Sequence, residues 1–265
     1  MAKRPRRMRV SIEHVTDPLD ATRKQWSSLA EAYLASPTHA SGEDLDWLLE
    51  LAAPDATEVA LDVGTGVGHV LKRLASRTRL AVGADATPGM LEGARKQLER
   101  EKITNAVIVI TAAEQLPFLD ASFDLVTCRL AAHHFRDVHA AFREIHRVLR
   151  PGGRFVLSDN YAPDDEALDR FINTLETLRD ATHVREHTVT GWRRVLEDAG
   201  LAVTDERRGT IHLETEPWLA RSRTPDERAA KVRDMLRTAA RAPRDTFGID
   251  DRGFDLLKVV LRATR

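Results

Sequence analysis

The sequence of 265 residues has little cysteine, glycine and proline, and it has no long apolar run. Its single cysteine, Cys128, cannot close an intramolecular disulfide bond, which excludes a disulfide scaffold and fits a reducing compartment. Glycine and proline, at 14 and 11 residues, are too few for a collagen-like or low-complexity chain. No apolar stretch approaches the ~20 residues that a membrane helix needs. We therefore expect a cytoplasmic protein without a membrane span.

An excess of charge of one sign is also absent. The 40 basic and 41 acidic residues give a net charge of −1, and 42% of the residues are hydrophobic, which together exclude intrinsic disorder. A basic tail at residues 3–9 could contact nucleic acid, but no basic stretch is interleaved with aromatic residues, so no nucleic-acid partner is expected. At roughly 150 residues per domain the length predicts ~1.8 domains, which leaves one large domain or two small ones open.

From Val59 onward, short apolar runs alternate with amphipathic helical stretches. This alternation is typical of parallel strands that cross over through helices. The unbroken apolar run at residues 107–110 predicts a strand buried on both faces. We expect the other strands at residues 59–63, 80–83, 123–128, 154–158, 201–204 and 256–261, and further helices at residues 22–35, 42–51 and 217–241.

A glycine-rich turn follows the first of these strands and reads GTGVG at residues 64–68. Such a turn exposes bare backbone and helix amide groups to a ligand, and both nicotinamide dinucleotides and S-adenosylmethionine bind to turns of this kind. The spacing G-x-G-x-G is one residue shorter than the pyrophosphate-binding pattern. In addition, Asp62 would repel a pyrophosphate and attract the ammonium group of a methionine moiety. Asp85, at the end of the second strand, suits the hydroxyl groups of a ribose.

Five segments occur in a fixed order within residues 59–158. They read LDVGTGVG at 61–68, GADATPGML at 83–91, AEQLPF at 113–118, SFD at 122–124 and RVLRPGG at 147–153. Together they resemble the successive motifs of class I S-adenosylmethionine-dependent methyltransferases. The resemblance is to the small-molecule branch that includes the ubiquinone and menaquinone biosynthesis methyltransferases.

The resemblance implies an α/β, Rossmann-like fold: a seven-stranded, mostly parallel sheet between helices, with a helical cover over its C-terminal edge. One domain over residues 1–265 is then expected. It would consist of an N-terminal helical cover (22–52), a cofactor-binding half (58–160), two helical insertions that form the acceptor pocket (161–188 and 210–247), and two segments that complete the sheet (189–209 and 253–265).

The resemblance also implies roles in binding S-adenosylmethionine, which leaves the reaction as S-adenosylhomocysteine. Below the methionine part lie Gly64, Thr65 and Gly66, and its amino group is held by Asp62. The ribose is bound by Asp85, the adenine is contacted by Ala86, Met90 and the backbone of Ala113, and the methionine carboxylate lies near Arg129. Relatives often carry an acceptor for the adenine amino group where this chain has Ala112, and Glu114 is the candidate substitute. The cofactor would be covered by Tyr33 and His39, although Tyr33 also fits plain helix packing.

Methyl transfer from a sulfonium is an in-line displacement that releases a neutral thioether. It needs no acid, and a base only if the acceptor arrives protonated. His133 and His134 follow the fourth strand, and Asp159 and Tyr161 follow the fifth, at the edge of the sheet where ligands bind in open α/β folds. Each of the four is a candidate for catalysis or substrate contact, and each also has a structural alternative as a loop residue.

Further candidates lie nearer the C-terminus. His183 and His187 are spaced to share one face of a helix, but no cysteine or carboxylate completes a familiar set of ligands, so no metal is expected. Arg185 is a candidate partner for an anionic substrate, and Trp218 is a candidate wall of the pocket. The single cysteine argues against thiol-relay chemistry, and the absence of an Asn-Pro-Pro motif after the fourth strand argues against base methylation.

The sequence therefore predicts S-adenosylmethionine-dependent methyl transfer to a small-molecule acceptor. Two alternatives stay open at this point: an NAD(P)-dependent oxidoreductase and a non-catalytic S-adenosylmethionine-binding protein. The identity of the methylated atom and the oligomeric state are both open.

Overall fold

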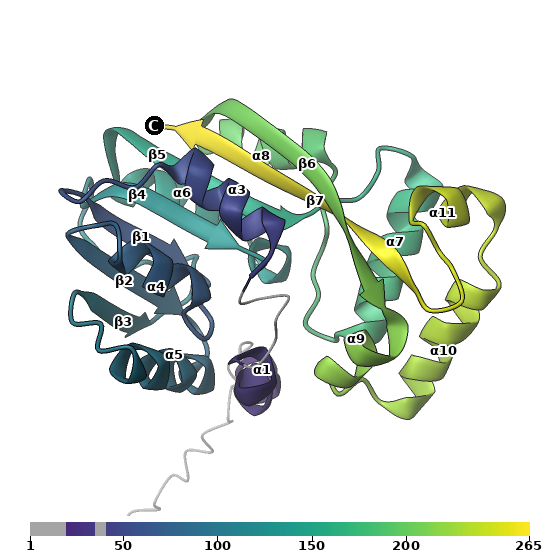
Figure 1. Ribbon diagram of the computed structural model, residues 1–265. Helices are drawn as coiled ribbons and strands as arrows, with labels where there is room; N and C mark the ends of the chain where they lie inside the picture. Colours follow the sequence, from purple (N-terminus) through teal and green to yellow (C-terminus); the bar gives the residue numbers. More distant parts are fainter. Residues whose placement is uncertain (1–19, 35–40) are drawn as a thin grey trace, which may run out of the picture.

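The computed structural model describes residues 20–34 and 41–265, and its centre is a seven-stranded sheet (Figure 1). The strand order is β3-β2-β1-β4-β5-β7-β6, in which β1 to β5 are parallel and β7 runs antiparallel to both of its neighbours. This order confirms the predicted Rossmann-like, mostly parallel sheet. The strands are β1 (Val59–Val63), β2 (Leu80–Asp85), β3 (Ala106–Ile110), β4 (Phe123–Arg129), β5 (Leu149–Asn160), β6 (Ala202–Glu214) and β7 (Gly253–Thr264).

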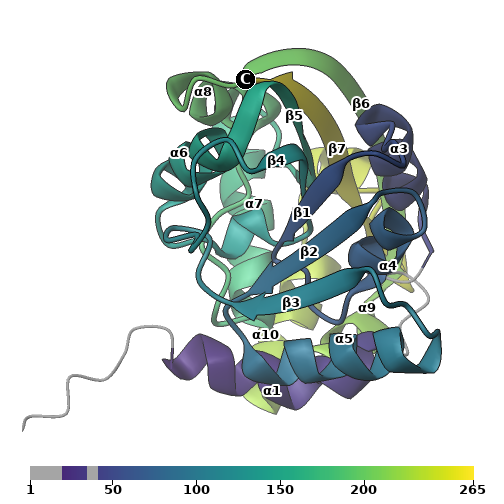
Figure 2. The same ribbon diagram turned by 90° about the vertical axis from the view of Figure 1, so that its left-hand side faces the viewer.

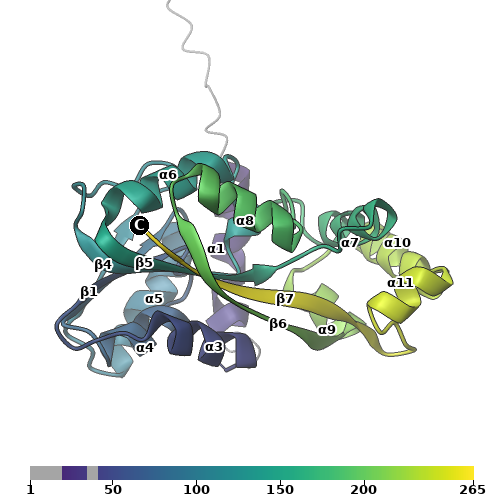
Figure 3. The same ribbon diagram turned by 90° about the horizontal axis from the view of Figure 1, so that it is seen from above.

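Helices cover both faces of the sheet (Figure 3). One face carries α3 (Glu43–Ala52), α4 (His69–Ala75) and α5 (Pro88–Arg100), and the other carries α6 (Val138–Val148) and α8 (Val189–Asp198). The apolar stripe of α6 explains its position, because Val138, Ala141, Phe142, Ile145 and Val148 recur at helical spacing and are all buried. The sheet and its two helical layers thus form the core that fixes the ends of the strands.

The strand β3 departs from the sequence prediction of a buried strand. It lies at the edge of the sheet, and Val107 and Ile110 keep 48% and 59% of their surface exposed. An unbroken apolar run is typical of a strand that is buried on both faces. An edge strand has a neighbouring strand on one side only, so its side chains are covered less completely.

The strands β6 and β7 form a long antiparallel ribbon that extends beyond the rest of the sheet (Figure 1). At its far end lies a separate apolar cluster that includes Ile172, Leu175, Trp218, Val232 and Phe254. We call the four helices at this end of the ribbon the lid helices. They are α7 (Glu166–Arg179), α9 (Thr215–Arg221), α10 (Asp226–Arg237) and α11 (Arg241–Thr246).

The second helical insertion begins later than predicted. Residues 210–214, expected within it, belong to β6, which pairs with β7 as far as Glu214. The expected helix over residues 217–241 is divided between α9, α10 and the start of α11. The segment 183–187, considered as a helix face for two histidines, is not helical.

The helix α1 (Asp20–Leu34) lies alongside α5 on the side where the parallel strands end (Figure 2). Leu29 and Tyr33 of α1 pack with Val67 and Met90, so this helix closes over the glycine-rich turn. His39 and the basic tail at residues 3–9 lie outside the described residues. Within the part of the chain that the structure describes, no helix combines the length and apolarity needed to cross a membrane.

Candidate active site

A cavity opens at the carboxyl ends of the parallel strands, between α1 and the lid helices. It brings together most of the residues singled out in the sequence. Those that line it are Tyr33, Asp62, Gly64, Thr65, Gly66, Asp85, Ala86, Met90, Ala113, Glu114, Arg129, His133, His134 and Trp218. Residues from strands far apart in the sequence thus share one site, as expected for the edge of a parallel sheet.

The glycine-rich turn forms the floor of the cavity. The backbone N–H groups of Gly64 and Thr65 donate to the carbonyl oxygen of Ala84, which ties the turn to β2. Gly64 and Gly66 have φ values of +70° and +54°, which glycine adopts without strain. A Cβ on Gly66 would meet no atom of the described residues within 4 Å, because it would project into the cavity. This residue therefore leaves room for a ligand to contact bare backbone.

Asp62 is a buried carboxylate at the end of β1. Its Oδ1 accepts a hydrogen bond of 2.7 Å from the hydroxyl of Thr127 on β4. Burial raises the pKa of Asp62 to about 6, because removal from water disfavours the charged form. A cationic ligand in the cavity would offset this cost, so the site is suited to an ammonium group.

Asp85 orders the backbone on which a ligand would lie. Its two oxygens accept hydrogen bonds from the N–H groups of Thr87, at 2.8 Å, and of Gly66, at 2.9 Å. Burial raises the pKa of this carboxylate above its ordinary value. Each carboxylate oxygen has a second lone pair, so Asp85 can still accept hydrogen bonds from a ligand's hydroxyl groups.

Glu114 lies on the rim of the cavity. Its Oε1 accepts hydrogen bonds from the backbone N–H groups of Arg136 and Asp137, at 3.1 and 3.4 Å, so it holds the loop that leads into α6. Ala112, where relatives carry an acceptor, also lines the cavity and offers only backbone groups. A role for Glu114 as the substitute stays a prediction.

Arg129 forms an ion pair with a residue that the sequence analysis did not single out. At the end of β4, its guanidinium donates to both oxygens of Asp44 on α3, at 2.6 and 3.0 Å. Both side chains are buried, and the pair ties α3 to the floor of the site. The expected place of Arg129 beside a methionine carboxylate stays a prediction, and Asp44 would share its charge.

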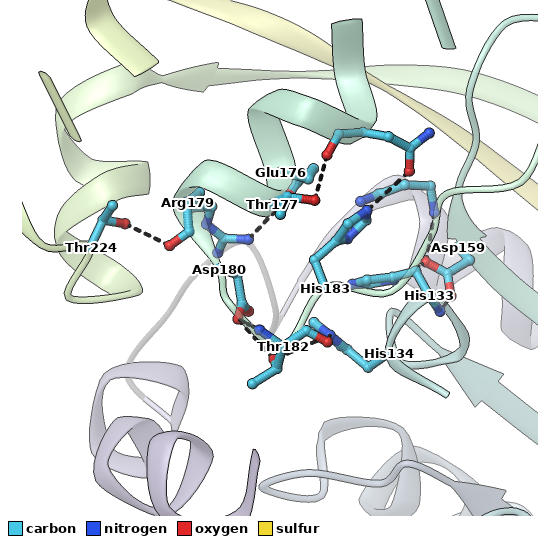
Figure 4. Close-up of polar contacts among 12 residues, drawn as sticks. His133, His134, Asp159, Glu176, Thr177, Arg179, Asp180, Thr182, His183 and Thr224 are labelled. Atoms are coloured by element: carbon cyan, nitrogen blue, oxygen red, sulfur yellow. Dashed lines mark hydrogen bonds and ion pairs between the residues drawn. The ribbon is translucent and has the colours of Figure 1, made fainter. Parts of the chain in front are cut away.

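His133 and Asp159 form a buried pair (Figure 4). The ring nitrogen Nδ1 of His133 lies 2.5 Å from Oδ1 of Asp159, and the backbone N–H of His133 donates to the other carboxylate oxygen at 3.3 Å. Burial alone would lower the pKa of His133, but the charge and hydrogen bond of Asp159 raise it above the ordinary value. Since Asp159 itself does not line the cavity, it acts through His133.

The neighbouring His134 differs from His133, because its surroundings lower the pKa of its ring. Its Nδ1 lies 3.1 Å from the carbonyl oxygen of Thr182, which can only accept, so Nδ1 carries the proton. Burial and the adjacent His133 lower the pKa of His134 to about 3. His134 is therefore a neutral imidazole, and its Nε2 is left as a hydrogen-bond acceptor.

The structure does not bring three predicted substrate residues to the cavity. The ring of Tyr161 packs beneath the guanidinium of Arg208, at 5.7 Å, outside the cavity. The Nε2 of His183 is hydrogen-bonded to Asn173 on α7, at 3.0 Å, so His183 lies behind His133. Arg185 forms an ion pair of 2.8 Å with Asp169 on the outer side of α7, which does not fit the expected contact with a substrate.

Sequence reasoning missed the residues that α7 and α9 add to the cavity. Glu176, Arg179 and Arg221 line it, and none was singled out. A signal was present, because Arg179 continues the apolar stripe of α7 that runs through Ile172 and Leu175. A charged residue in such a stripe is buried with the apolar ones and needs a partner.

Comparison with known proteins agrees with this geometry. A family model described as a methyltransferase domain matches residues 61–157. The uncharacterised methyltransferase YcgJ of Bacillus subtilis is 39% identical over 224 residues, which cover 84% of this chain and 88% of that protein. Its crystal structure superimposes with a TM-score of 0.81 at 35% identity, over 84% of this chain and 98% of that one. A demethylmenaquinone methyltransferase of Thermus thermophilus is 38% identical over 121 residues, 44% of this chain and 54% of that protein.

The sheet order, the glycine-rich turn and the acidic residues at the ends of β1 and β2 define a Rossmann-like methyltransferase. The chain belongs to the family of S-adenosylmethionine-dependent methyltransferases. This membership removes the oxidoreductase alternative.

Proposed function

We propose that this enzyme transfers the methyl group of S-adenosylmethionine to a small-molecule acceptor whose nucleophilic atom arrives protonated, as in a phenol, an enol or an alcohol. The observation that carries the proposal is the pair of His133 and Asp159, because His133 lines the same cavity as the glycine-rich turn. The buried Cys128 thiol fits a reducing compartment, so we include a cytoplasmic location in the proposal.

The residues of the cavity floor fit the cofactor. Asp62, a buried carboxylate with a raised pKa, would hold the amino group of the methionine part, and Asp85 would hold the ribose. The bare backbone at Gly66 would lie beneath the methionine, and Ala86, Met90 and Ala113 would contact the adenine. Bound there, S-adenosylmethionine supplies a methyl group activated by its sulfonium and a leaving group that needs no acid.

His133 is arranged to take a proton from the acceptor. With Nδ1 committed to Asp159, its Nε2 lone pair is the free site on the ring. Asp159 stabilises the imidazolium that forms, much as a carboxylate orients the histidine in other proton-transfer sites. A raised pKa makes His133 a stronger base, and its burial keeps water from competing for the proton.

His134 has a different part in this proposal. Because its pKa is lowered to about 3, it holds a proton poorly near neutral pH. Its Nε2 can accept a hydrogen bond from the acceptor and orient it, without removing the proton. Trp26, whose ring lies 5.0 Å from the His134 ring, limits the orientations available to the acceptor on the side of α1.

Two measurements test the proposal. Calorimetric titration of the purified chain with S-adenosylhomocysteine and with NAD(P) tests the cofactor, and we expect binding of the first alone. Incubation with methyl-labelled S-adenosylmethionine and a metabolite extract tests turnover, and we expect label in a small-molecule product.

The variants His133→Ala and Asp159→Asn should bind S-adenosylhomocysteine as the wild type does and lose turnover. Binding of cofactor without any labelled product would instead support a non-catalytic S-adenosylmethionine-binding protein. Full turnover by His133→Ala would remove the base from the proposal.

A further inference from the structure

The end of the cavity formed by the lid differs in character from its floor. Its walls are apolar and come from the ribbon and α9, namely Ile211, Leu213, Trp218 and Leu256. Two guanidinium groups, those of Arg179 and Arg221, interrupt this apolar surface. Neither residue lies within the stretch that matches the methyltransferase domain model, which ends at residue 157.

Arg179 is held firmly at the end of α7. It is buried with 8% of its surface exposed, and it forms an ion pair of 3.2 Å with Glu176 one turn earlier. Its guanidinium lies 4.9 Å from the centre of the Trp218 ring and donates to the hydroxyl of Tyr33 at 3.3 Å. Its Nε is buried and has no hydrogen-bond partner among residues 20–34 and 41–265. These contacts fix the orientation of Arg179 and leave its Nε–H donor unused.

Arg221, the last residue of α9, lies close enough for the two arginines to interact. Burial and the charge of Arg179 lower its pKa, so the two cations destabilise one another. Tyr33 and the charge of Glu176 act in the opposite direction and compensate Arg221 only in part. Among the described residues, the buried Nε of Arg221 has no hydrogen-bond partner. A partly buried cation whose charge is compensated only in part is costly, and a bound anion reduces the cost.

Two carboxylates lie near the two arginines. Glu176 pairs with Arg179, and the charge of Asp180 also stabilises Arg179, although Oδ1 of Asp180 accepts hydrogen bonds from Gln25 and Thr182. These carboxylates would repel a multiply charged diphosphate more strongly than a singly charged anion such as a carboxylate.

We propose that the methyl acceptor is a carboxylic acid with a flat apolar body, and that its carboxylate binds between Arg179 and Arg221. Guanidinium groups favour this pairing, because their N–H groups form a fork that fits two carboxylate oxygens. The body of the acid lies along Trp218 and Leu213, and its nucleophilic atom faces His133 on the same cavity. The inference rests on the function proposed above, and it moves the anion contact expected of Arg185 to this pair.

A matched pair of probes tests the charge requirement. The S-adenosylhomocysteine complex is titrated calorimetrically with 2-naphthoate and with 2-naphthamide, which have the same body and differ in charge. We expect the acid to bind about tenfold or more tightly than the amide, as for hydrogen bonds to a charged group. This preference should vanish in Arg221→Gln, return in part in Arg221→Lys, and persist in the control Arg223→Gln, an exposed neighbour.

Three results would overturn the inference. The first is that 2-naphthoate binds no more tightly than 2-naphthamide, or that neither probe binds. The second is a preference that survives in Arg221→Gln. The third is an Arg221→Gln variant that loses affinity for S-adenosylhomocysteine and keeps its affinity for 2-naphthoate, which would assign the arginines to the cofactor's own carboxylate. The probes are also titrated without S-adenosylhomocysteine, so that failure of the cofactor to bind is recognised separately as a failure of the proposed function.

Discussion

The adjacent residues His133 and His134 differ in the pKa of their imidazole rings. His133 faces a carboxylate and has a raised pKa, whereas His134 faces a backbone carbonyl and has a lowered one. Identical side chains in consecutive positions thus become a base and a neutral hydrogen-bonding group. The difference arises from Asp159 and Thr182, which are brought to the two rings by β5 and by the segment after α7.

We predict that the pKa of His133 depends on Asp159. In the wild type, the proton of His133 should be lost at a higher pH than that of a free imidazole. In Asp159→Asn the carboxylate's charge is gone and burial remains, so the midpoint should move to lower pH. An NMR titration of the ring Cε1–H resonances measures this shift, with the exposed His212 as a reference. An unchanged midpoint would contradict the assignment of the pair.

Two glycines of the turn should respond differently to alanine. A Cβ on Gly66 projects into the cavity, so Gly66→Ala should fold, with about 1 kcal/mol lost to its positive φ. It should weaken S-adenosylhomocysteine binding about tenfold or more, which corresponds to ~1.4 kcal/mol. A Cβ on Gly64 would instead overlap the side chain of Ala131, so Gly64→Ala should lower stability further, by about 1–3 kcal/mol.

Calorimetric titration and chemical denaturation of the two variants separate these effects. Gly66→Ala with normal affinity for S-adenosylhomocysteine would mean that the ligand does not lie over this turn.

The residues of the cofactor half could be predicted because local rules fix their positions. Asp62 and Asp85 end consecutive parallel strands, and the turn between β1 and α4 can have few conformations. Arg179 and Arg221 could not be predicted in this way. They lie on different helices and meet only when the ribbon and α7 pack together, which no local pattern encodes.

At the scale of elements, the ribbon of β6 and β7 connects the sheet to the lid helices. The sequence predicted only a short piece of β6, because residues 205–208 are all charged and hide the alternation of a strand. This segment is held by backbone pairing with β7 rather than by burial of its side chains. Such a strand belongs to the edge of a sheet, where charged residues also discourage pairing with another chain.

Packing of the ribbon against α3 gives a prediction at this scale. A Cβ on Gly209 would lie 2.5 Å from the Trp47 ring, so Gly209→Ala should cost about 1–3 kcal/mol by overpacking. The exposed neighbour Thr210 is the matched control, and Thr210→Ala should change stability by less than about 0.5 kcal/mol. Urea denaturation followed by circular dichroism measures both. Equal stability of the two variants would show that α3 can move away from the ribbon.

At the scale of the whole molecule, the sheet and the lid have separate apolar clusters, and buried charged groups lie where they meet. The sheet order followed from the family resemblance. The arrangement of the lid did not, because helices as short as α9 and α11 have weak periodicity and several ways to pack. Glu186 belongs to this junction. It is fully buried, and neither carboxylate oxygen has a hydrogen-bond partner among the described residues.

Glu186 predicts how stability depends on pH. Burial, followed by the charge of Glu176, raises its pKa from 4.5 to about 8. Between these values the folded protein keeps a proton that the unfolded chain loses, so this group reduces stability as pH rises from 4.5 to 8. Glu186→Gln has no such proton. Its melting temperature relative to the wild type should therefore increase from pH 5 to pH 8, and a difference that does not change with pH would contradict the raised pKa.

The pairing of Glu214 with Gly253 has a consequence for how new specificities could arise. These residues face one another at the tip of the ribbon, and three of the four lid helices lie on the chain between them. Facing residues of an antiparallel pair are only about 5 Å apart, so the excursion over residues 215–252 leaves the sheet and returns to it at nearly one point. A single contiguous exchange or insertion there would replace Trp218 and Arg221 of the acceptor wall and leave every strand register intact. Recombination among relatives at this segment would change the acceptor end of the cavity and leave the cofactor half unchanged.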